Sequence, residues 1–225
     1  MDRTESDATA PSRRDREWDD SPPTDTATAT FGLGCFWGPD ARFGAMDGVV
    51  RTRVGYAGGM TSAPTYHSLG DHTEVVQVVY DPTVVSYDEL LEVCWAIHDW
   101  GSPAHKRQYR GVVLTHTERQ HEAATRQRTA LEERAGRSVE TMIERLDQFF
   151  LAEDYHQKYE LRSTPVVGDE LAAQYGETFV DSTVIARLNG FVAGHGTPER
   201  RAALLETLDL DPQVLAELRR RFRSG

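Results

Sequence analysis

The chain has 225 residues, of which 39% are hydrophobic, so it is long enough for one large domain with a real core, and wholesale disorder is excluded. A formal net charge of −11 argues against binding to nucleic acid or to an anionic membrane surface. No apolar run approaches the roughly 18 residues of a membrane span, the N-terminus carries no apolar signal segment, and two cysteines cannot form a disulfide scaffold, so we expect a cytoplasmic protein.

The first 25 residues are rich in acids, arginines and prolines and contain few large apolar side chains. Such a composition cannot bury enough apolar surface to order itself, so residues 1–25 are predicted to form a disordered acidic tail. Across the whole chain only Lys106 and Lys158 are lysines, the other basic residues being arginines. This bias has two readings, a GC-rich genome or a high-salt cytoplasm that screens the excess of acids.

Strand and helix patterns alternate after the predicted tail. Alternating or β-branched apolar residues predict strands at 26–33, 49–54, 73–80, 109–115 and 139–146. Helices are predicted at 38–46, after a capping box at Ser86 and Glu89, and from a Thr117 cap to about residue 134. Beyond Glu153 the pattern is helical, with loops at 164–165 and 195–198. This order predicts helices packed on a mixed sheet.

The segment Gly34-Cys35-Phe36-Trp37-Gly38 lies where the first strand ends and a helix begins. Unsatisfied backbone N–H groups and the positive end of a helix dipole favour a thiolate at such a position. The flanking glycines permit a sharp turn and a close approach of substrate, and Phe36 with Trp37 offers an aromatic wall beside the sulfur. A buried structural cysteine is the alternative reading, and the surrounding residues favour a reactive thiol.

Several polar side chains could donate hydrogen bonds beside this thiol. Tyr66 lies in a Gly-rich loop, Glu74 opens a strand, and Tyr109 opens another. Tyrosine hydroxyls and a carboxylic acid kept neutral by an apolar pocket are suited to bind a polar, weakly basic oxygen. Taken singly, each is also explained as a strand-edge tyrosine or a solvated acid. The chain contains no Cys/His set with metal-ligand spacing, and no metal is expected.

The Gly34–Gly38 segment resembles the signature of the peptide methionine sulfoxide reductase A family, which reduces the S epimer of methionine sulfoxide. Further blocks resemble the family in its own order: GYAGG at 55–59, PTY at 64–66, HTEVV at 72–76, VYDP at 79–82, YDELL at 87–91, IHD at 97–99, QYR at 108–110 and AEDYHQKY at 152–159. Ordered blocks from about residue 28 to residue 160 are not expected by chance.

The resemblance implies an α+β fold: a central mixed β-sheet with a βαβ (ferredoxin-like) core flanked by helices, an irregular N-terminal tail and a helical C-terminal extension. It implies a catalytic domain at 26–165 and an extension at 166–225 packed on the same domain. The substrate would be methionine sulfoxide, free or in proteins. We expect no bound cofactor, an external thiol reductant (a thioredoxin-like protein or a small thiol), no nucleic-acid or membrane partner, and a monomer.

The resemblance also implies a role for each site residue. Cys35 would attack the sulfoxide sulfur, while Phe36 and Trp37 would hold the S-methyl group. Glu74, as a neutral acid, would protonate the sulfoxide oxygen, helped by hydrogen bonds from two tyrosines, Tyr66 and Tyr109. The family also has His156 and Tyr159 near the substrate, although a packing role suits this pair equally well.

Two departures from the family pattern concern the catalytic cycle. Ala104 stands where many members carry an Asp, which removes one hydrogen bond from the expected pocket. The chain has no cysteine after Cys94, which shares a helical face with Leu90, Val93 and Ile97 and is predicted to be a core residue. We therefore expect a one-cysteine cycle in which an external thiol reduces a sulfenic acid on Cys35.

Two other classes of function are compatible with a reactive cysteine. A non-catalytic homologue could bind methionine sulfoxide or sense oxidants, a reading favoured by Ala104 and by the missing resolving cysteine. A Cys-His hydrolase is the third reading, and no matching His and Asn context accompanies Cys35.

Overall fold

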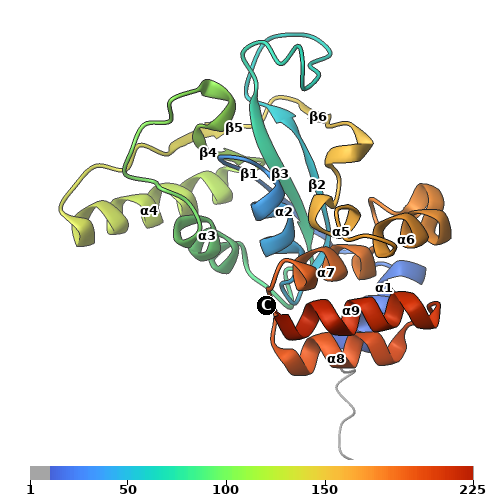
Figure 1. Ribbon diagram of the computed structural model, residues 1–225. Helices are drawn as coiled ribbons and strands as arrows, with labels where there is room; N and C mark the ends of the chain where they lie inside the picture. Colours follow the sequence, from blue (N-terminus) through green and yellow to red (C-terminus); the bar gives the residue numbers. More distant parts are fainter. Residues whose placement is uncertain (1–10, 225) are drawn as a thin grey trace, which may run out of the picture.

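The computed structural model describes residues 11–224, with side chains from residue 14 to residue 223 (Figure 1). Its centre is a six-stranded sheet in the order β5-β4-β1-β3-β2-β6. The strands are β1 (Ala27–Leu33), β2 (Val49–Ala57), β3 (Thr73–Tyr80), β4 (Gly111–Thr115), β5 (Met142–Arg145) and β6 (Phe149–Leu151). The β4–β5 pair is parallel and the other pairs are antiparallel, so the predicted α+β class with a mixed sheet is confirmed.

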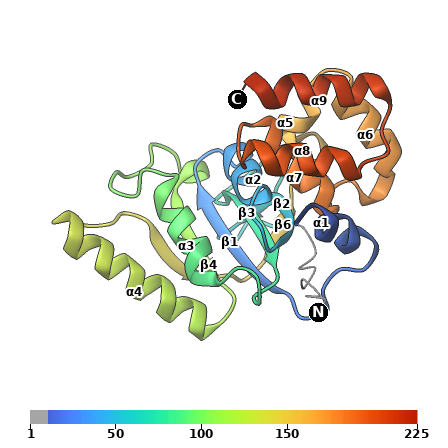
Figure 2. The same cartoon turned by 90° about the horizontal axis from the view of Figure 1, so that it is seen from below.

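Helices surround this sheet (Figure 2). The α-helices are α1 (Pro11–Asp20), α2 (Trp37–Gly44), α3 (Tyr87–Ala96), α4 (Glu118–Ala135), α5 (Tyr159–Arg162), α6 (Val167–Tyr175), α7 (Thr183–Val192), α8 (Pro198–Thr207) and α9 (Pro212–Ser224). The short 3-10 turns are η1 (Arg107–Tyr109), η2 (Asp154–His156) and η3 (Gly176–Thr178). The caps predicted from Ser86 with Glu89 and from Thr117 are confirmed at the starts of α3 and α4.

The connection through α2 determines where the candidate nucleophile lies. Strands β1 and β2 are both antiparallel to β3, which lies between them, so they run parallel and α2 is their crossover. The turn that leads from β1 into α2 therefore lies at the carboxyl end of β1. The Gly34–Gly38 segment spans this turn and the first residues of α2.

Several strand boundaries differ from the prediction, including those of β5, which is shorter than the predicted strand at 139–146. β2 continues through Gly55 to Ala57, because a residue without a Cβ lets β6 pair closely; a Cβ at Gly55 would collide with the carbonyl oxygen of Phe150. Strand β6 itself was not predicted, since it has only three residues. Tyr109 lies in η1 and not in β4, which begins at Gly111.

The prediction of a disordered tail is wrong for residues 11–20, which form α1; residues 1–10 lie outside the described residues. Asp15 is buried and pairs with the buried Arg187 of α7, with 3.1 Å from its Oδ1 to Nε. Asp19 accepts hydrogen bonds from the Ser182 hydroxyl and the Thr183 N–H at the start of α7. Composition alone predicts that these two acids are solvated. In the fold, the buried Arg187 stabilises Asp15, and the N-terminus of α7 stabilises Asp19.

The C-terminal helices form a second hydrophobic cluster that packs against α2. α7 approaches α2 closely because Gly44 and Gly190 face the backbone of the opposite helix, where a Cβ would collide. The C-terminal helices and α4 lie at opposite ends of the molecule (Figures 1 and 2). Between residues 11 and 224, no helix combines the length and apolar character needed to cross a bilayer.

Candidate active site

Cys35 is exposed in the turn between β1 and α2, where the motif places it. Gly34 before it has φ +89°, a conformation that glycine adopts without strain, and this residue turns the chain out of the sheet. The backbone N–H of Trp37 donates a hydrogen bond to the sulfur. The thiol is thus accessible from solvent and lies just before the N-terminus of α2.

The structure corrects the expectation that this position favours the thiolate. Burial by surrounding atoms is the largest influence on the sulfur and raises the pKa of Cys35, although the Trp37 N–H opposes the rise. The nearby carboxylates of Glu74 and Glu160 raise this pKa further, because negative charge disfavours a thiolate. In the free protein Cys35 is therefore mainly a thiol at neutral pH.

Replacing Glu74 by Gln is expected to lower the pKa of Cys35, because one of the negative charges that oppose ionisation is removed. The midpoint is measured from the rate of iodoacetamide alkylation against pH, in a Cys94→Ala background that leaves one thiol. Glu160→Gln is the matched variant and is expected to give a smaller shift in the same direction, since Glu160 has the weaker influence. A midpoint that stays or rises in Glu74→Gln would contradict this electrostatic contact.

Glu74, at the start of β3, is 1% exposed and lies behind the cysteine turn. Its Oε2 accepts the backbone N–H of Phe36 at 3.2 Å, and its Oε1 accepts the side-chain amide of Gln108 at 2.7 Å. Burial raises the pKa of Glu74 above its usual value, with these two hydrogen bonds opposing the rise. A carboxyl group in this setting holds a proton at higher pH than a solvated one does.

Tyr66 and Tyr109 come together beside this carboxyl group from two different segments. Burial, the charge of Glu74, the hydrogen bond that Tyr109 makes to the side chain of Tyr66 and the charge of Cys35 together raise the pKa of Tyr109 to about 12. The backbone N–H of Tyr66 donates to Oε1 of Glu153 at 2.9 Å. The phenol of Tyr109 therefore remains a hydrogen-bond donor at neutral pH.

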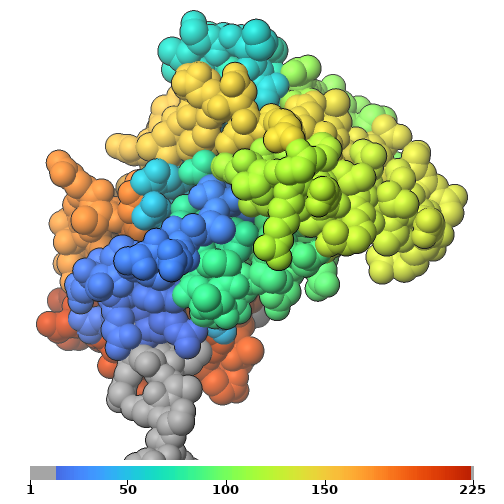
Figure 3. All heavy atoms as spheres, turned by 180° about the vertical axis from the view of Figure 1, so that it is seen from behind, coloured from blue at the N-terminus to red at the C-terminus, as the bar shows by residue number. Residues whose placement is uncertain are grey.

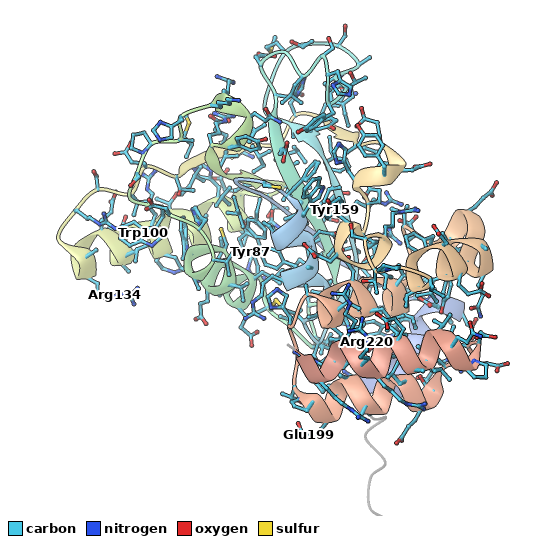
Figure 4. All side chains as sticks on the ribbon, viewed as in Figure 1. Tyr87, Trp100, Arg134, Tyr159, Glu199 and Arg220 are labelled. Atoms are coloured by element: carbon cyan, nitrogen blue, oxygen red, sulfur yellow. The ribbon has the colours of Figure 1, made fainter. Side chains whose placement is uncertain are left out.

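Aromatic rings form a wall next to Cys35. Trp37 stacks on Tyr159 with 3.6 Å between ring centroids and 4° between planes, and Tyr159 lies next to α2 (Figure 4). Trp37 Nε1 donates to Nδ1 of His156 at 3.3 Å, which leaves Nε2 of the buried histidine without a partner among the described residues. His156 also contacts the rings of Phe36 and Tyr66, at 5.1 and 4.8 Å between centroids.

A buried polar cluster connects α2 to the segment that carries His156 and Tyr159. Lys158 and Asp40 are both fully buried, with 3.3 Å from Nζ to Oδ1. Lys158 Nζ also donates to the carbonyl of Thr52 at 2.6 Å, and Asn189 of α7 donates its side-chain amide to Oδ2 of Asp40 at 3.2 Å. This cluster joins three elements directly behind the aromatic wall.

The structure brings all the predicted site residues to one region, namely Cys35, Phe36, Trp37, Tyr66, Glu74, Tyr109, His156 and Tyr159. Sequence reasoning did not single out Gln108, Glu153 or Tyr56, although all three lie within the blocks that resemble the family. Tyr56 OH donates to Oε2 of Glu153 at 2.7 Å and so supports the acceptor of the Tyr66 N–H. Ala104 is exposed in the segment before η1 and supplies no carboxylate there.

Cys94 is fully buried in the main hydrophobic core, so its predicted core placement is confirmed. Burial raises the pKa of its thiol well above the usual range. The described residues contain no group of three or more His, Cys, Asp or Glu side chains that could hold a metal ion. The chemistry available at the site is therefore an accessible thiol beside a buried acid, two phenols and an aromatic wall.

Comparison with known proteins identifies the family. A family model described as peptide methionine sulfoxide reductase matches residues 27–181. The peptide methionine sulfoxide reductase of Drosophila melanogaster is 44% identical over 188 residues, which cover 83% of this chain and 76% of the fly protein. The reductase named MsrA from Methanothermobacter thermautotrophicus is 47% identical over 143 residues, which cover 58% of this chain and 84% of the archaeal protein.

Solved structures agree with the sequence comparisons. Reduced Mxr1 from Saccharomyces cerevisiae superposes with a TM-score of 0.60 at 28% identity, over 64% of this chain and 88% of the yeast chain. Methionine sulfoxide reductase A of Corynebacterium diphtheriae superposes with a TM-score of 0.56 at 33% identity, over 63% of this chain and 76% of that chain. The chain belongs to the peptide methionine sulfoxide reductase family and is an enzyme that reduces methionine sulfoxide.

Proposed function

We propose that the protein reduces the S epimer of methionine sulfoxide, free or in proteins, through a sulfenic acid on Cys35. The main support for the proposal is that an exposed thiol, a buried acid of raised pKa and two phenols lie close together in one site. A sulfoxide oxygen is a poor leaving group until it gains a proton. Nucleophile and proton donor must therefore act on adjacent atoms of the same substrate group.

In the proposed first step the Cys35 sulfur attacks the sulfoxide sulfur while Glu74 delivers a proton to the oxygen. Hydrogen bonds from Tyr66 and Tyr109 stabilise the developing charge on that oxygen. The attack joins the two sulfurs transiently. The S–O bond then breaks, the hydroxyl group passes to the Cys35 sulfur, the bond between the two sulfurs breaks and methionine leaves. The thiol proton returns to Glu74, and Cys35 is left as the sulfenic acid. The sulfoxide is reduced by two electrons to the sulfide, and the cysteine sulfur is oxidised by two.

In the proposed second step an external thiol attacks the sulfenic sulfur and releases water, forming a mixed disulfide with Cys35. A second thiolate displaces Cys35 from this disulfide and regenerates the free cysteine. A small thiol or a thioredoxin-like protein is the proposed reductant. No tightly bound cofactor takes part in either step.

The aromatic residues are proposed to select the substrate. Phe36 and Trp37 would hold the S-methyl group, and the stacking of Trp37 on Tyr159 together with its hydrogen bond to His156 fixes the orientation of the indole. A rigid ring on one side and oxygen donors on the other can accept one arrangement of methyl, oxygen and lone pair around a chiral sulfur. This asymmetry is the physical basis for selecting one epimer.

The proposal is tested with dabsyl-methionine S-sulfoxide and R-sulfoxide, dithiothreitol as reductant, and Cys35→Ser as the control. Turnover of the S epimer that is absent in Cys35→Ser is the expected result. Without reductant, one methionine per chain and a dimedone adduct on Cys35 are expected. Turnover of both epimers at equal rates would contradict the epimer assignment. A dimedone adduct formed by peroxide without any turnover would favour the sensor function.

Cys94→Ala is expected to leave dithiothreitol-driven turnover within about twofold of the wild type, because a thiol sealed in the core cannot reach a sulfenic acid at the surface. The free energy of unfolding should fall by about 1 kcal/mol through loss of the buried sulfur. The measurements are steady-state turnover and urea unfolding. A collapse of turnover in a variant with a normal unfolding midpoint would overturn the one-cysteine cycle.

A further inference from the structure

The loop between β2 and β3, residues 58–72, projects from one end of the sheet and carries Tyr66 (Figures 1 and 3). Asp71 ties the end of this loop to its beginning. Its carboxylate accepts the backbone N–H groups of Met60 and Thr61 at 2.9 and 3.0 Å, and the Thr61 hydroxyl at 2.8 Å. These hydrogen bonds hold the pKa of Asp71 well below its usual range, so the tie is a charged one.

Arg107 reaches both ends of the same loop from the neighbouring segment. Its Nε donates to the carbonyl oxygen of Asp71 at 2.5 Å, and its terminal nitrogen donates to the carbonyl oxygen of Gly58 at 3.0 Å. Arg110 adds a second donor to the Gly58 carbonyl at 3.2 Å. A planar guanidinium suits two such acceptors because its donors diverge in a rigid fork.

Arg107 is also the first residue of the turn that carries two side chains of the site. Gln108 donates to Oε1 of Glu74, and Tyr109 shares a hydrogen bond with Tyr66. The position of Tyr66 relative to Tyr109 therefore depends on how the loop is held against η1. Arg107 makes that connection directly, by joining the backbone of η1 to both ends of the loop.

We propose that Arg107 is a positioning residue that holds the Tyr66 loop in register with Tyr109, so that both phenols meet the same substrate oxygen. The inference rests on the proposed function of the two tyrosines. Arg107 is exposed, which argues against a role in the core, and its guanidinium is engaged with backbone carbonyls. The N–H bond from Tyr66 to Glu153 fixes the middle of the loop, whereas its base is held by Asp71 within the loop and by Arg107 and Arg110 from the neighbouring segment.

Arg107→Gln is expected to lower kcat about 5–10-fold with a change in KM of less than about twofold, because donors to the oxygen matter most in the transition state. In a Tyr66→Phe background the same substitution is expected to have no further effect, since the hydroxyl that Arg107 positions is already absent. Arg107→Lys should keep only part of the kcat that Arg107→Gln loses. An ammonium group retains the charge and can donate to a carbonyl, but it lacks the rigid fork that reaches both carbonyls at once.

A phenol titration tests the placement independently of turnover. The pKa of Tyr109, about 12, is raised in part by its hydrogen bond with Tyr66, so displacement of the loop is expected to lower it. The absorbance of the phenolate near 295 nm is followed in Arg107→Gln and in the wild type, each against its own Tyr109→Phe derivative. A downward shift supports the inference, and an unchanged titration overturns it.

Arg126→Gln is the matched control, because Arg126 is an exposed arginine that pairs with Asp88 at the start of α3. If the wild type reduces S-sulfoxide and Arg107→Gln does so equally well, the inference fails and the proposed function stands. If Arg107→Gln lowers kcat by the same factor in the wild-type and Tyr66→Phe backgrounds, Arg107 does not act through Tyr66, and the inference also fails. If the wild type shows no turnover, the proposed function fails and the titration alone decides the placement.

Discussion

Replacing Glu74 by Gln is expected to lower kcat for methionine S-sulfoxide by about 10²–10⁴-fold near neutral pH, the usual range for loss of general acid catalysis. An amide cannot deliver a proton to the sulfoxide oxygen. It retains nearly the same volume and an oxygen that can accept the Phe36 N–H or the Gln108 amide, so the fold should survive. The loss should appear in kcat rather than in KM, since protonation takes place in the transition state.

The dependence of activity on pH is a second test of the acid role of Glu74. A general acid works in its protonated form, and burial raises the pKa of Glu74, so wild-type activity should decline as pH rises through that raised value. Glu74→Gln should lack this alkaline decline. Glu118→Gln, at an exposed ion pair with Arg145, serves as the control and should keep the wild-type profile. Full activity of Glu74→Gln at neutral pH would refute the acid role.

Lys158→Met is expected to lower the free energy of unfolding by about 3–5 kcal/mol, the cost of removing one partner from a buried ion pair. Lys158 and Asp40 are both fully buried, so the substitution would leave Asp40 without its cation in a site closed to solvent. The hydrogen bonds from Thr52 and Asn189 to Asp40 persist and limit the loss. A change of this size is a large fraction of the stability of a typical domain.

Urea unfolding measures this change, and the second lysine of the chain supplies a matched control. Lys106 is exposed, so Lys106→Met should alter the free energy of unfolding by less than about 0.5 kcal/mol. Adding Asp40→Asn to Lys158→Met removes the unpaired charge and should recover part of the loss. Equal effects of the two lysine substitutions would contradict the buried pair.

Much of the site could be predicted from the sequence because its chemistry is local. Glycine beside Cys35, a strand before it and a helix after it together define an exposed turn, and the structure has that turn. Glu74 at the start of an apolar strand was a candidate for burial, and it is buried. Such features depend on neighbouring residues in the chain, which a pattern records directly.

The rest depends on partners that are remote in the chain. Nothing near Asp15 in the sequence indicates that a buried arginine of α7 faces it, so the sequence predicts a disordered tail where the structure has a helix. The residues next to Cys35 in the sequence likewise predict a thiolate at the start of a helix. In the structure, burial and the carboxylates of Glu74 and Glu160 raise the pKa of Cys35. Glu153 accepts the backbone N–H of Tyr66 and Gln108 donates to the carboxyl group of Glu74, both contacts with segments remote in the chain, and no periodic pattern marks such contacts.

The burial of Lys158 has a practical consequence for chemical labelling. Only two side-chain amines exist in the chain, and one is sealed behind the aromatic wall. Apart from the α-amino group, an amine-reactive dye should therefore attach at the exposed Lys106, which caps the turn leading to Tyr109. A fluorophore placed there would report on the approach of a substrate peptide or a reductant without any engineered cysteine to compete with Cys35.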